Sequence, residues 1–335
     1  MTSDVYKNKD YSTLKQMCDD YRHVASTGGI NMEYKPNQHF KSVNINNFGM
    51  RGDDITKEKP NDVYRIMMIG GSTVFGSGTT SDMATIPGFL QEKIEDSNYS
   101  QKIEVINSGT EGTTTVEETL RIKNRLIDFN PDLIIIYNGW NDNRLSWDKN
   151  IDNSKFEASI QKKVLYTIQT ILPEYHTPIN GAYFFQSIIK KDFQDKDNET
   201  INPIITSEHV FEKASLWSDR IKDVCELGNQ KDFKTIVILQ PFLGTGNKVL
   251  TEWEHNEFIS IGGESNVKTY NEFASGLMDL QNDCYQVEDF RTVFDGVSEH
   301  IFYDEVHLSD RGNEIVSKKI LEVIESTLLA SALSN

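Results

Sequence analysis

The chain has 335 residues, of which 51 are Asp or Glu and 34 are Lys or Arg, so its formal net charge is −17. Such an acidic chain excludes nucleic-acid binding through a dominant basic patch, because the phosphate backbone would be repelled. Hydrophobic residues make up 37% and charged residues 25%, which is typical of a globular protein, and no apolar stretch approaches the ~18 residues that a membrane span requires.

The first 60 residues are rich in Tyr, Asn and Asp and contain a turn-rich run at 46–52. The stretch from Met1 to Asp20 is largely polar and lacks the apolar core of a secretory signal. We expect residues 1–60 to form an N-terminal extension that packs on a larger domain at 61–335.

Four short apolar runs rich in Ile and Val predict buried parallel strands at 65–69, 103–106, 133–137 and 235–239. Stretches with helical spacing lie between them, and an apolar stripe from Ile315 to Ile324 predicts a closing helix. This alternation predicts an α/β fold, a doubly wound and mostly parallel sheet of about five strands flanked by helices.

The helix after the second strand is expected to begin at Thr115, with Glu118 completing a capping box. The interval at about 143–234 does not fit the simple alternation. Helical patterns at 156–172 and 210–224 surround a polar loop at 190–200. We expect this insertion to form a helical cap or lid.

The cysteines are Cys18, Cys225 and Cys284, an odd number without C-x-x-C spacing. This pattern argues against a disulfide framework and against a cysteine-rich zinc site. We therefore interpret all three as buried thiols and expect a reducing, cytoplasmic location.

Directly after the first strand, the run Gly70-Gly71-Ser72-Thr73 would raise the Ser72 hydroxyl above the carboxyl edge of the sheet, where open α/β sheets bind ligands. Glycine neighbours would let backbone N–H groups approach a reacting oxygen, so Ser72 is a candidate nucleophile. The run could instead be a plain strand-to-helix connection or a phosphate cradle. It lacks the Lys of a P-loop and the third Gly of a dinucleotide fingerprint.

Three other segments could complete a site for acyl chemistry. The turn after the second strand contains Gly109 and Gly112, and Asn141 follows the third strand. Their amides could hold a developing negative charge, although Gly and Asn are also common loop residues. Near the C-terminus, Asp304 stands three residues before His307 and could orient its imidazole as a base.

Taken in order, these blocks resemble those of the SGNH hydrolase family, also called GDSL esterases. The resemblance implies that Ser72 is the nucleophile and His307 the base, oriented by Asp304. It also assigns the oxyanion hole to the Ser72 and Gly112 amides and the Asn141 side chain.

Gly112 is preferred to Gly109 because it stands five residues after Asn107, as the oxyanion glycine does in the family; Gly109 remains the alternative. The chain departs from the family at Gly71, where most members have Asp.

The resemblance implies a serine esterase that needs neither cofactor nor metal. We expect short acyl esters, such as O-acetyl groups on a carbohydrate, because no long apolar stretch suggests an acyl-chain tunnel. Aromatic residues in and near the insertion could stack on sugars or simply pack in a core: Trp147, Tyr166, Tyr183 and Trp217.

Several alternatives stay open. An O-acyltransferase would use the same acyl-enzyme, and a non-catalytic carbohydrate-binding or scaffold protein would use none. A metal site built from His300, Asp304 and His307 is a weaker fourth possibility. Neither a nucleic acid nor a membrane is expected as a partner, and the oligomeric state is not indicated.

Overall fold

The computed structural model describes residues 4–6, 9–28, 33–97, 99–144 and 207–332. The predicted helix at 156–172 and the polar loop at 190–200 lie outside these residues, as do Trp147, Tyr166 and Tyr183. No helix in the described part of the chain is both long and apolar enough to cross a lipid bilayer.

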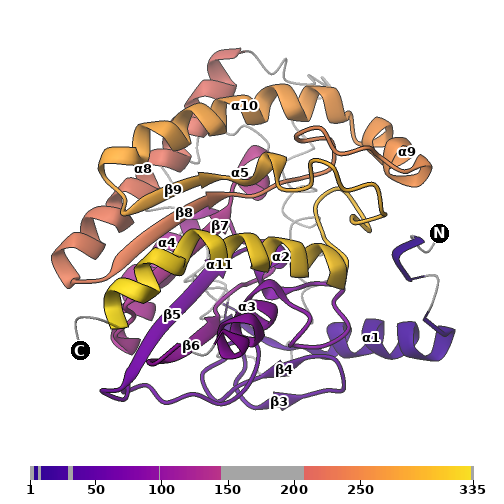
Figure 1. Cartoon of the computed structure of the whole chain (residues 1–335). Coiled ribbons are helices and arrows are strands. Elements are labelled where there is room, and N and C mark those ends of the chain that lie inside the picture. The colour runs from indigo at the N-terminus through magenta and orange to yellow at the C-terminus, as the bar shows by residue number, and fades with distance from the viewer. Residues whose placement is uncertain (1–3, 7–8, 29–32, 98, 145–206, 333–335) are drawn as a thin grey trace, which may run out of the picture.

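A parallel five-stranded sheet forms the centre of the fold, in the order β6-β5-β7-β8-β9 (Figure 1). Its strands are β5 (Val63–Gly70), β6 (Lys102–Asn107), β7 (Leu133–Asn138), β8 (Lys234–Leu239) and β9 (Gln286–Asp289). All four pairings are parallel. The predicted doubly wound sheet is therefore confirmed, and its strand order reverses between β5 and β7, where such sheets bind ligands.

The four apolar runs form the central strands because both faces of the sheet are covered. Along β5, Met67 and Ile69 belong to the hydrophobic core on one face, whereas Ile66 and Met68 belong to the core on the other. Strand β9 has no such pattern. It is half-buried at the sheet edge, so no apolar run in the sequence predicts it.

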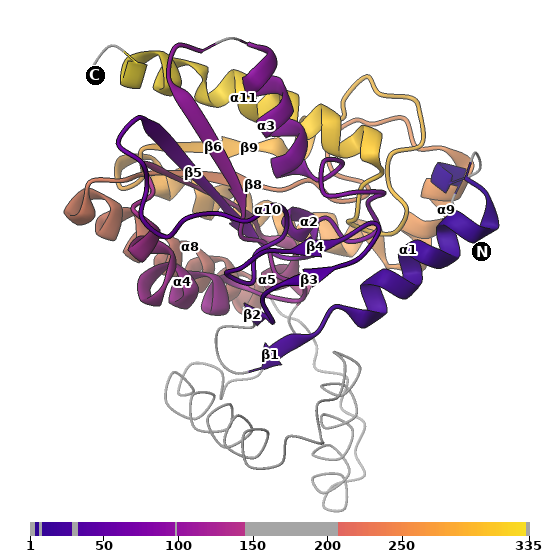
Figure 2. The same ribbon diagram turned by 90° about the horizontal axis from the view of Figure 1, so that it is seen from below.

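Two layers of helices enclose the sheet (Figure 2). Helices α3 (Ile86–Asp96) and α11 (Asp310–Ala332) cover one face, and α4 (Thr115–Asn124), α8 (Ser207–Lys231) and α10 (Gly263–Asp279) cover the other. Helix α11 is the predicted closing helix. Shorter helices connect these layers: α2 (Ser72–Phe75), η2 (Leu126–Phe129), α5 (Trp140–Arg144), α9 (Glu252–Ser260), η5 (Leu280–Asn282) and η6 (Phe290–Thr292).

Helix α8 lies inside the interval predicted to be a cap or lid, yet it packs in the main core. Its Trp217 and Ile221 are fully buried with residues of the sheet and of α10. Trp217 therefore has no face for stacking on a sugar, and its indole N–H donates to Asn138 Oδ1 at 3.0 Å.

The predicted capping box of α4 is wrong by one residue. Thr114 is the N-cap, and Glu117 accepts its backbone N–H at 3.0 Å. Thr115 and Glu118 instead point inward and are buried. The sequence contains two overlapping Thr-x-x-Glu motifs, Thr114 with Glu117 and Thr115 with Glu118. Because the second pair is buried, the first pair caps the helix.

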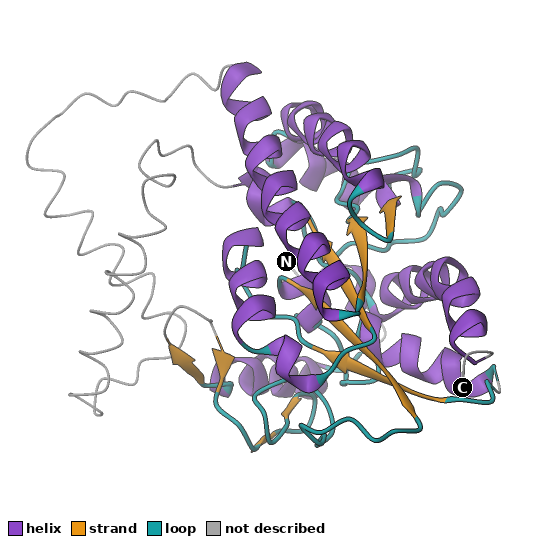
Figure 3. Ribbon diagram, turned by 90° about the vertical axis from the view of Figure 1, so that its left-hand side faces the viewer, coloured by secondary structure: helices purple, strands orange, loops and turns teal. Residues whose placement is uncertain are grey.

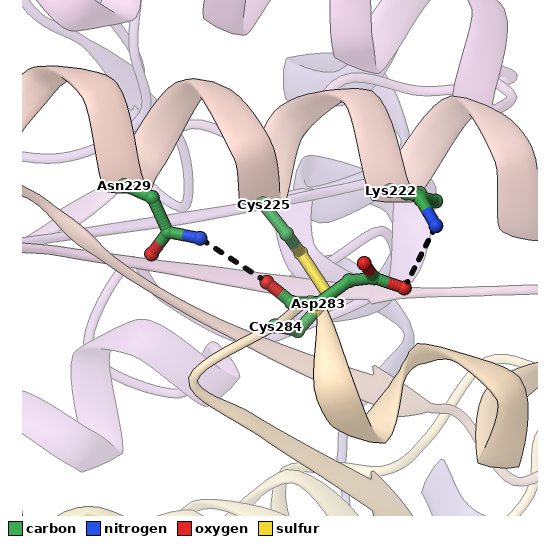
Figure 4. Close-up of a disulfide and its surroundings, with 5 residues drawn as sticks. All are labelled: Lys222, Cys225, Asn229, Asp283 and Cys284. Carbon is green, nitrogen blue, oxygen red and sulfur yellow. Dashed lines mark hydrogen bonds and ion pairs between the residues drawn. A yellow bond between two sulfur atoms is a disulfide. The ribbon is translucent and has the colours of Figure 1, made fainter.

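The interpretation of the cysteines as buried thiols is also wrong. Cys225 on α8 and Cys284, just before β9, form a disulfide across 59 residues of sequence (Figure 4). Cys18 is free, but it is exposed. Disulfides are typical of oxidising compartments, so the argument from reduced thiols to a cytoplasmic location falls away.

The described part of the N-terminal segment contains a short 3₁₀-helix, an α-helix and two small strand pairs. These elements are η1 (Asp4–Tyr6), α1 (Tyr11–His23), β1 (Ser26–Gly28), β2 (Glu33–Tyr34), β3 (Gln38–His39) and β4 (Asn44–Ile45). The β1–β2 pair lies apart from the main sheet (Figure 3). Arg51 at the end of this segment is buried and donates to the carbonyls of Phe75 and Gly76 at 3.0 and 2.8 Å. The segment thereby supports the turn that follows α2.

Candidate active site

Ser72 is the first residue of α2, directly beyond the end of β5. Gly70 must be small, because a Cβ there would lie 2.2 Å from the Tyr137 carbonyl oxygen. This close approach to β7 lets the chain turn sharply and leaves the Ser72 side chain half-buried at the carboxyl edge of the sheet. The Ser72 N–H belongs to the first turn of α2, where backbone N–H groups have no partner within a helix.

The loop before α11 brings Asp304 and His307 to the same edge. Nε2 of His307 lies 2.6 Å from Ser72 Oγ, and Nδ1 lies 2.7 Å from Asp304 Oδ2. Because the ionised carboxylate can only accept, Nδ1 carries a proton, and Nε2 is then able to accept the hydroxyl proton of Ser72. Side chains 235 positions apart thus form one chain of hydrogen bonds.

Asp304 is itself held by the backbone. Its Oδ1 accepts the N–H groups of Val306 and His307 at 3.0 and 2.7 Å. The ring of Tyr303 stacks on the His307 ring, with centroids 5.4 Å apart and planes 12° from parallel. Tyr303 also donates to the Ser77 carbonyl at 2.6 Å, which ties this loop to the turn after α2.

Electrostatics favour an ionised Asp304 and a basic imidazole. Burial alone would lower the pKa of His307, but the hydrogen bond and charge of Asp304, with smaller contributions from Glu111 and Glu305, raise it above its usual value. Burial would raise the pKa of Asp304, yet its hydrogen bonds from His307 and its charge interaction with that ring hold the pKa below the usual range.

Asn141, the second residue of α5, lies beside Gly71, the residue that precedes Ser72. Its Nδ2 donates to the Thr113 carbonyl at 2.7 Å. A Cβ on Gly71 would lie only 2.7 Å from the same nitrogen. The glycine that replaces the usual Asp of the family therefore leaves the space that the Asn141 amide occupies.

The two candidate glycines differ in what their backbones can do. Gly109 packs against α2, since a Cβ there would lie 2.1 Å from the Phe75 nitrogen, and its N–H donates to Asn107 Oδ1 at 3.0 Å. Gly112 is exposed, has a φ of +72° that favours glycine, and has open space around its Cα. This geometry favours Gly112 over Gly109 as a donor to a ligand.

A sequence model of the family described as GDSL-like lipase/acylhydrolase matches residues 66–320, well over half of the chain. The chain belongs to this family. The match confirms the predicted resemblance and makes the protein an enzyme of the acylhydrolase class. No curated protein sequence matches this acylhydrolase significantly.

Solved structures of esterases and lipases are similar to it at low identity. The acetyl xylan esterase AlAXEase is 14% identical, with 78% of this chain and 99% of that one covered and a TM-score of 0.43. TesA is 10% identical, with 78% of this chain and 98% of that one covered and a TM-score of 0.46. A lipase/acylhydrolase from Enterococcus faecalis is 16% identical, with 79% of this chain and 96% of that one covered and a TM-score of 0.45.

The alternative metal site is not assembled. Both ring nitrogens of His307 are engaged, and His300 Nε2 lies 2.7 Å from the Phe302 carbonyl. Within the described ranges, no three His, Cys, Asp or Glu side chains are grouped to hold a metal ion. A cavity of about 840 Å³ beside the edge strand β6, lined by residues such as Asp53, Pro87 and Ile103, does not include Ser72 or His307.

Sequence reasoning missed two buried carboxyl groups behind the site of this acylhydrolase, Glu118 and Asp142. Both are almost fully buried. Glu118 contacts Thr113 and Asn138, and Asp142 accepts the hydroxyl of Thr115 at 2.5 Å. The available signal was the second Thr-x-x-Glu motif, which leaves one glutamate unused by the cap.

Proposed function

We propose that the protein is a serine esterase in which Ser72 attacks the ester carbonyl, His307 acts as general base and acid, and Asp304 orients the imidazole. The observation that carries this proposal is the pair of short contacts from His307, at 2.6 Å to Ser72 Oγ and 2.7 Å to Asp304 Oδ2. Ester hydrolysis by a nucleophilic serine requires this geometry, in which the base lies within hydrogen-bond distance of both the nucleophile and the orienting carboxylate.

In the acylation step the Ser72 Oγ–acyl bond forms while Oγ loses its proton to His307 Nε2. Collapse of the tetrahedral intermediate breaks the bond to the alcohol, which leaves with the proton that His307 returns. Water then attacks the acyl carbon while His307 Nε2 takes a proton from it. The Ser72 Oγ–acyl bond breaks, His307 returns the proton to Oγ, and the carboxylic acid is released. Asp304 stays ionised and stabilises the transient imidazolium.

The negative oxygen of the intermediate would be held by the N–H groups of Ser72 and Gly112 and by Asn141 Nδ2. Each such donor typically lowers the barrier by about 2.7–4 kcal/mol. Asn141 Nδ2 donates to the Thr113 carbonyl with one of its two hydrogens, and the second is available for a substrate oxygen.

The substrate that we propose is an ester of a short acyl group, such as an O-acetyl group on a carbohydrate. The support is the polar character of the groups near the Ser72–His307 pair. The Ser77 N–H donates to the Ser72 carbonyl at 2.9 Å, the Ser77 hydroxyl donates to Glu111 at 2.5 Å, and the charge of Glu111 acts on His307. Polar groups of this kind suit a hydroxyl-rich alcohol better than a long alkyl chain.

Replacement of Ser72 by Ala tests the mechanism. We expect Ser72→Ala to lower kcat for p-nitrophenyl acetate by at least about 10⁴-fold, and Asn141→Ala by about 10²–10³-fold, because one removes the nucleophile and the other a charge-stabilising donor. A fluorophosphonate probe should label the wild type at Ser72 and leave Ser72→Ala unlabelled.

Ser97→Ala is the control, because Ser97 is an exposed serine at the end of α3. The Ser97→Ala variant should hydrolyse p-nitrophenyl acetate and react with the fluorophosphonate probe as the wild type does. Unchanged turnover by well-folded Ser72→Ala protein would refute the mechanism. A preference for p-nitrophenyl esters of eight or more carbons over acetate would refute only the short acyl group.

A further inference from the structure

Two of the three proposed oxyanion donors, Gly112 and Asn141, lie on separate segments, and one buried side chain bridges these segments. Gly112 lies in the β6–α4 loop next to Thr113, and Asn141 stands three residues after Asn138, the last residue of β7. Oε1 of Glu118 lies 3.2 Å from Thr113 Oγ1, and Oε2 accepts from Asn138 Nδ2 at 2.6 Å. Glu118 as a whole is 2% exposed.

The neighbours of the Thr113 hydroxyl favour a protonated Glu118. The single hydroxyl hydrogen of Thr113 has its shortest acceptor in the Thr110 carbonyl at 2.9 Å, with the Gly70 carbonyl farther away at 3.4 Å. If that hydrogen goes to Thr110, the contact between Glu118 and Thr113 needs a proton on Glu118. A neutral carboxylic acid donates to Thr113 Oγ1 and still accepts from Asn138, so it satisfies both neighbours.

We propose that Glu118 is a positioning residue of this esterase, a buried carboxylic acid that fixes the Gly112 loop and the Asn141 segment relative to each other. The inference rests on the proposed function, because it concerns the oxyanion donors of that mechanism. The side chain of Glu118 forms its hydrogen bonds with Thr113 and Asn138, and it would act through these two residues.

The charges around Glu118 agree with a neutral acid. Burial, together with the charge of Asp142 on α5, raises the pKa of Glu118 to about 8, although Asn138 and Thr113 oppose the shift. Glu117 and Arg121 on α4 also interact with it electrostatically, and Arg220 on α8 faces the neighbouring Asp142. Arg121 donates to the Ser108 carbonyl at 2.6 Å and to Thr110, so its guanidinium forms hydrogen bonds with the β6–α4 loop.

Three variants separate a positioning role from simple support of the fold. Glu118→Gln keeps one acceptor for Asn138 and one donor for Thr113, so we expect kcat within about threefold of the wild type. Glu118→Ala removes the bridge, and we expect kcat to fall about ten- to a hundredfold with little change in KM, as for a misplaced catalytic geometry. Ser317→Ala, which deletes a buried hydroxyl on α11, is the control and should leave kcat unchanged.

The assay is p-nitrophenyl acetate hydrolysis with kcat divided by the concentration of fluorophosphonate-labelled sites, so unfolded protein does not count. The pH profile of kcat, corrected for spontaneous hydrolysis, adds a second readout. Above pH of about 8 the wild type should lose activity as Glu118 ionises and Thr113 turns its hydrogen away from Thr110. Glu118→Gln, which cannot ionise, should lack this alkaline loss.

Wild-type kcat per labelled site in Glu118→Ala would overturn the proposal, and so would Glu118→Gln as impaired as Glu118→Ala. If Glu118→Ala does not fold, the pH profile of kcat at alkaline pH is the deciding measurement. The same loss of activity at alkaline pH in the wild type and in Glu118→Gln would overturn the proposal. Failure of the proposed function is distinguishable, because Ser72→Ala would then remain active.

Discussion

Gly71 and Asn141 show how one missing side chain shapes the site. The backbone of Gly71 has a φ of −76°, which any residue can adopt, so glycine is not required there for backbone conformation. Its Cα instead faces the Asn141 amide, and a Cβ would lie 2.7 Å from Nδ2. The Gly-Gly-Ser sequence and the position of Asn141 are therefore two parts of one arrangement.

We expect Gly71→Ala to lower kcat for p-nitrophenyl acetate about ten- to a hundredfold, because the added methyl group displaces the Asn141 amide from the developing oxyanion. Gly71→Asp, which restores the residue usual in the family, should be at least as impaired. The measurement is kcat per fluorophosphonate-labelled site.

Gly276→Ala on α10 is the matched control, since its Cβ would meet its nearest atom, the Ala214 carbonyl oxygen, at an ordinary 3.4 Å. It should keep wild-type kcat. Full activity of Gly71→Ala would mean that Asn141 either moves freely or does not hold the oxyanion.

The residues of the candidate site differ in how visible they are in the sequence. Ser72, Asp304 and His307 stand in short motifs at the ends of predicted strands or before the last helix, so their chemistry and spacing reveal them. Glu118 is not visible in this way. Its sequence context predicts a helix cap, and only the packing of α4 against β7 shows that it faces Asn138.

At the scale of elements, a buried ion pair supports the loop that carries Asp304 and His307. Glu254 on α9 is fully buried, and its Oε1 accepts the N–H groups of Ile301 and Phe302 at 3.0 and 3.2 Å. Its Oε2 accepts from Lys248 at 2.6 Å. One carboxylate thus joins α9 to the segment just before Asp304.

We expect Glu254→Gln to lower the free energy of unfolding at pH 7 by about 3–5 kcal/mol, because it leaves the Lys248 ammonium buried without its counter-charge. Burial would raise the pKa of Glu254, but the hydrogen bond from Lys248 and those from the backbone lower it overall. The ionised form therefore stabilises the fold above the ordinary Glu pKa of about 4.3, and this contribution is lost as the pH falls through the lowered value.

Urea unfolding at pH 7 and at pH 3 measures the effect, and the difference between variant and wild type should shrink at the lower pH. Glu322→Gln is the control, since its pair with Lys319 is about half exposed and should contribute at most about 1 kcal/mol. An equal, small loss in both variants would contradict the prediction.

The predictability of the elements follows their burial. Strands β5, β6, β7 and β8 are predicted within two residues at each end because the apolar run of each predicts burial in the sheet. Strand β9 consists of Gln, Val, Glu and Asp, and its pairing with β8 depends on backbone hydrogen bonds that leave no signal in the sequence. The one-residue shift at α4 has the same cause, since the choice between two caps depends on tertiary contacts.

At the scale of the whole molecule, the disulfide connects the helical layer to the edge of the sheet. Cys225 lies on α8, and Cys284 lies between η5 and β9. The bond has a sequence separation of 59, and the segment that it closes includes β8, α9 and α10. Both cysteines are buried in the main core. The cysteine count could not reveal the pair, because the unpaired Cys18 makes the total odd.

We expect removal of the bond, by reduction or in the Cys225→Ala/Cys284→Ala variant, to lower the free energy of unfolding by about 2–4 kcal/mol, since the cross-link restricts the unfolded chain. Calorimetry or urea unfolding with and without reductant measures this loss. Cys18→Ser should unfold as the wild type does and respond equally to reductant. Indifference of the wild type to reductant would argue against the bond.

The positions of the disulfide and of the Ser72–His307 contact have a consequence for proteolysis. A protease that cuts anywhere between 145 and 206 leaves Ser72 on the first fragment, and both His307 and the cross-linked cysteines on the second. No covalent bond then joins the two fragments, and the hydrogen bonds of β7 with β8, together with helix packing, must keep them associated. Denaturant would separate such a nicked enzyme into two inactive fragments, with or without reductant.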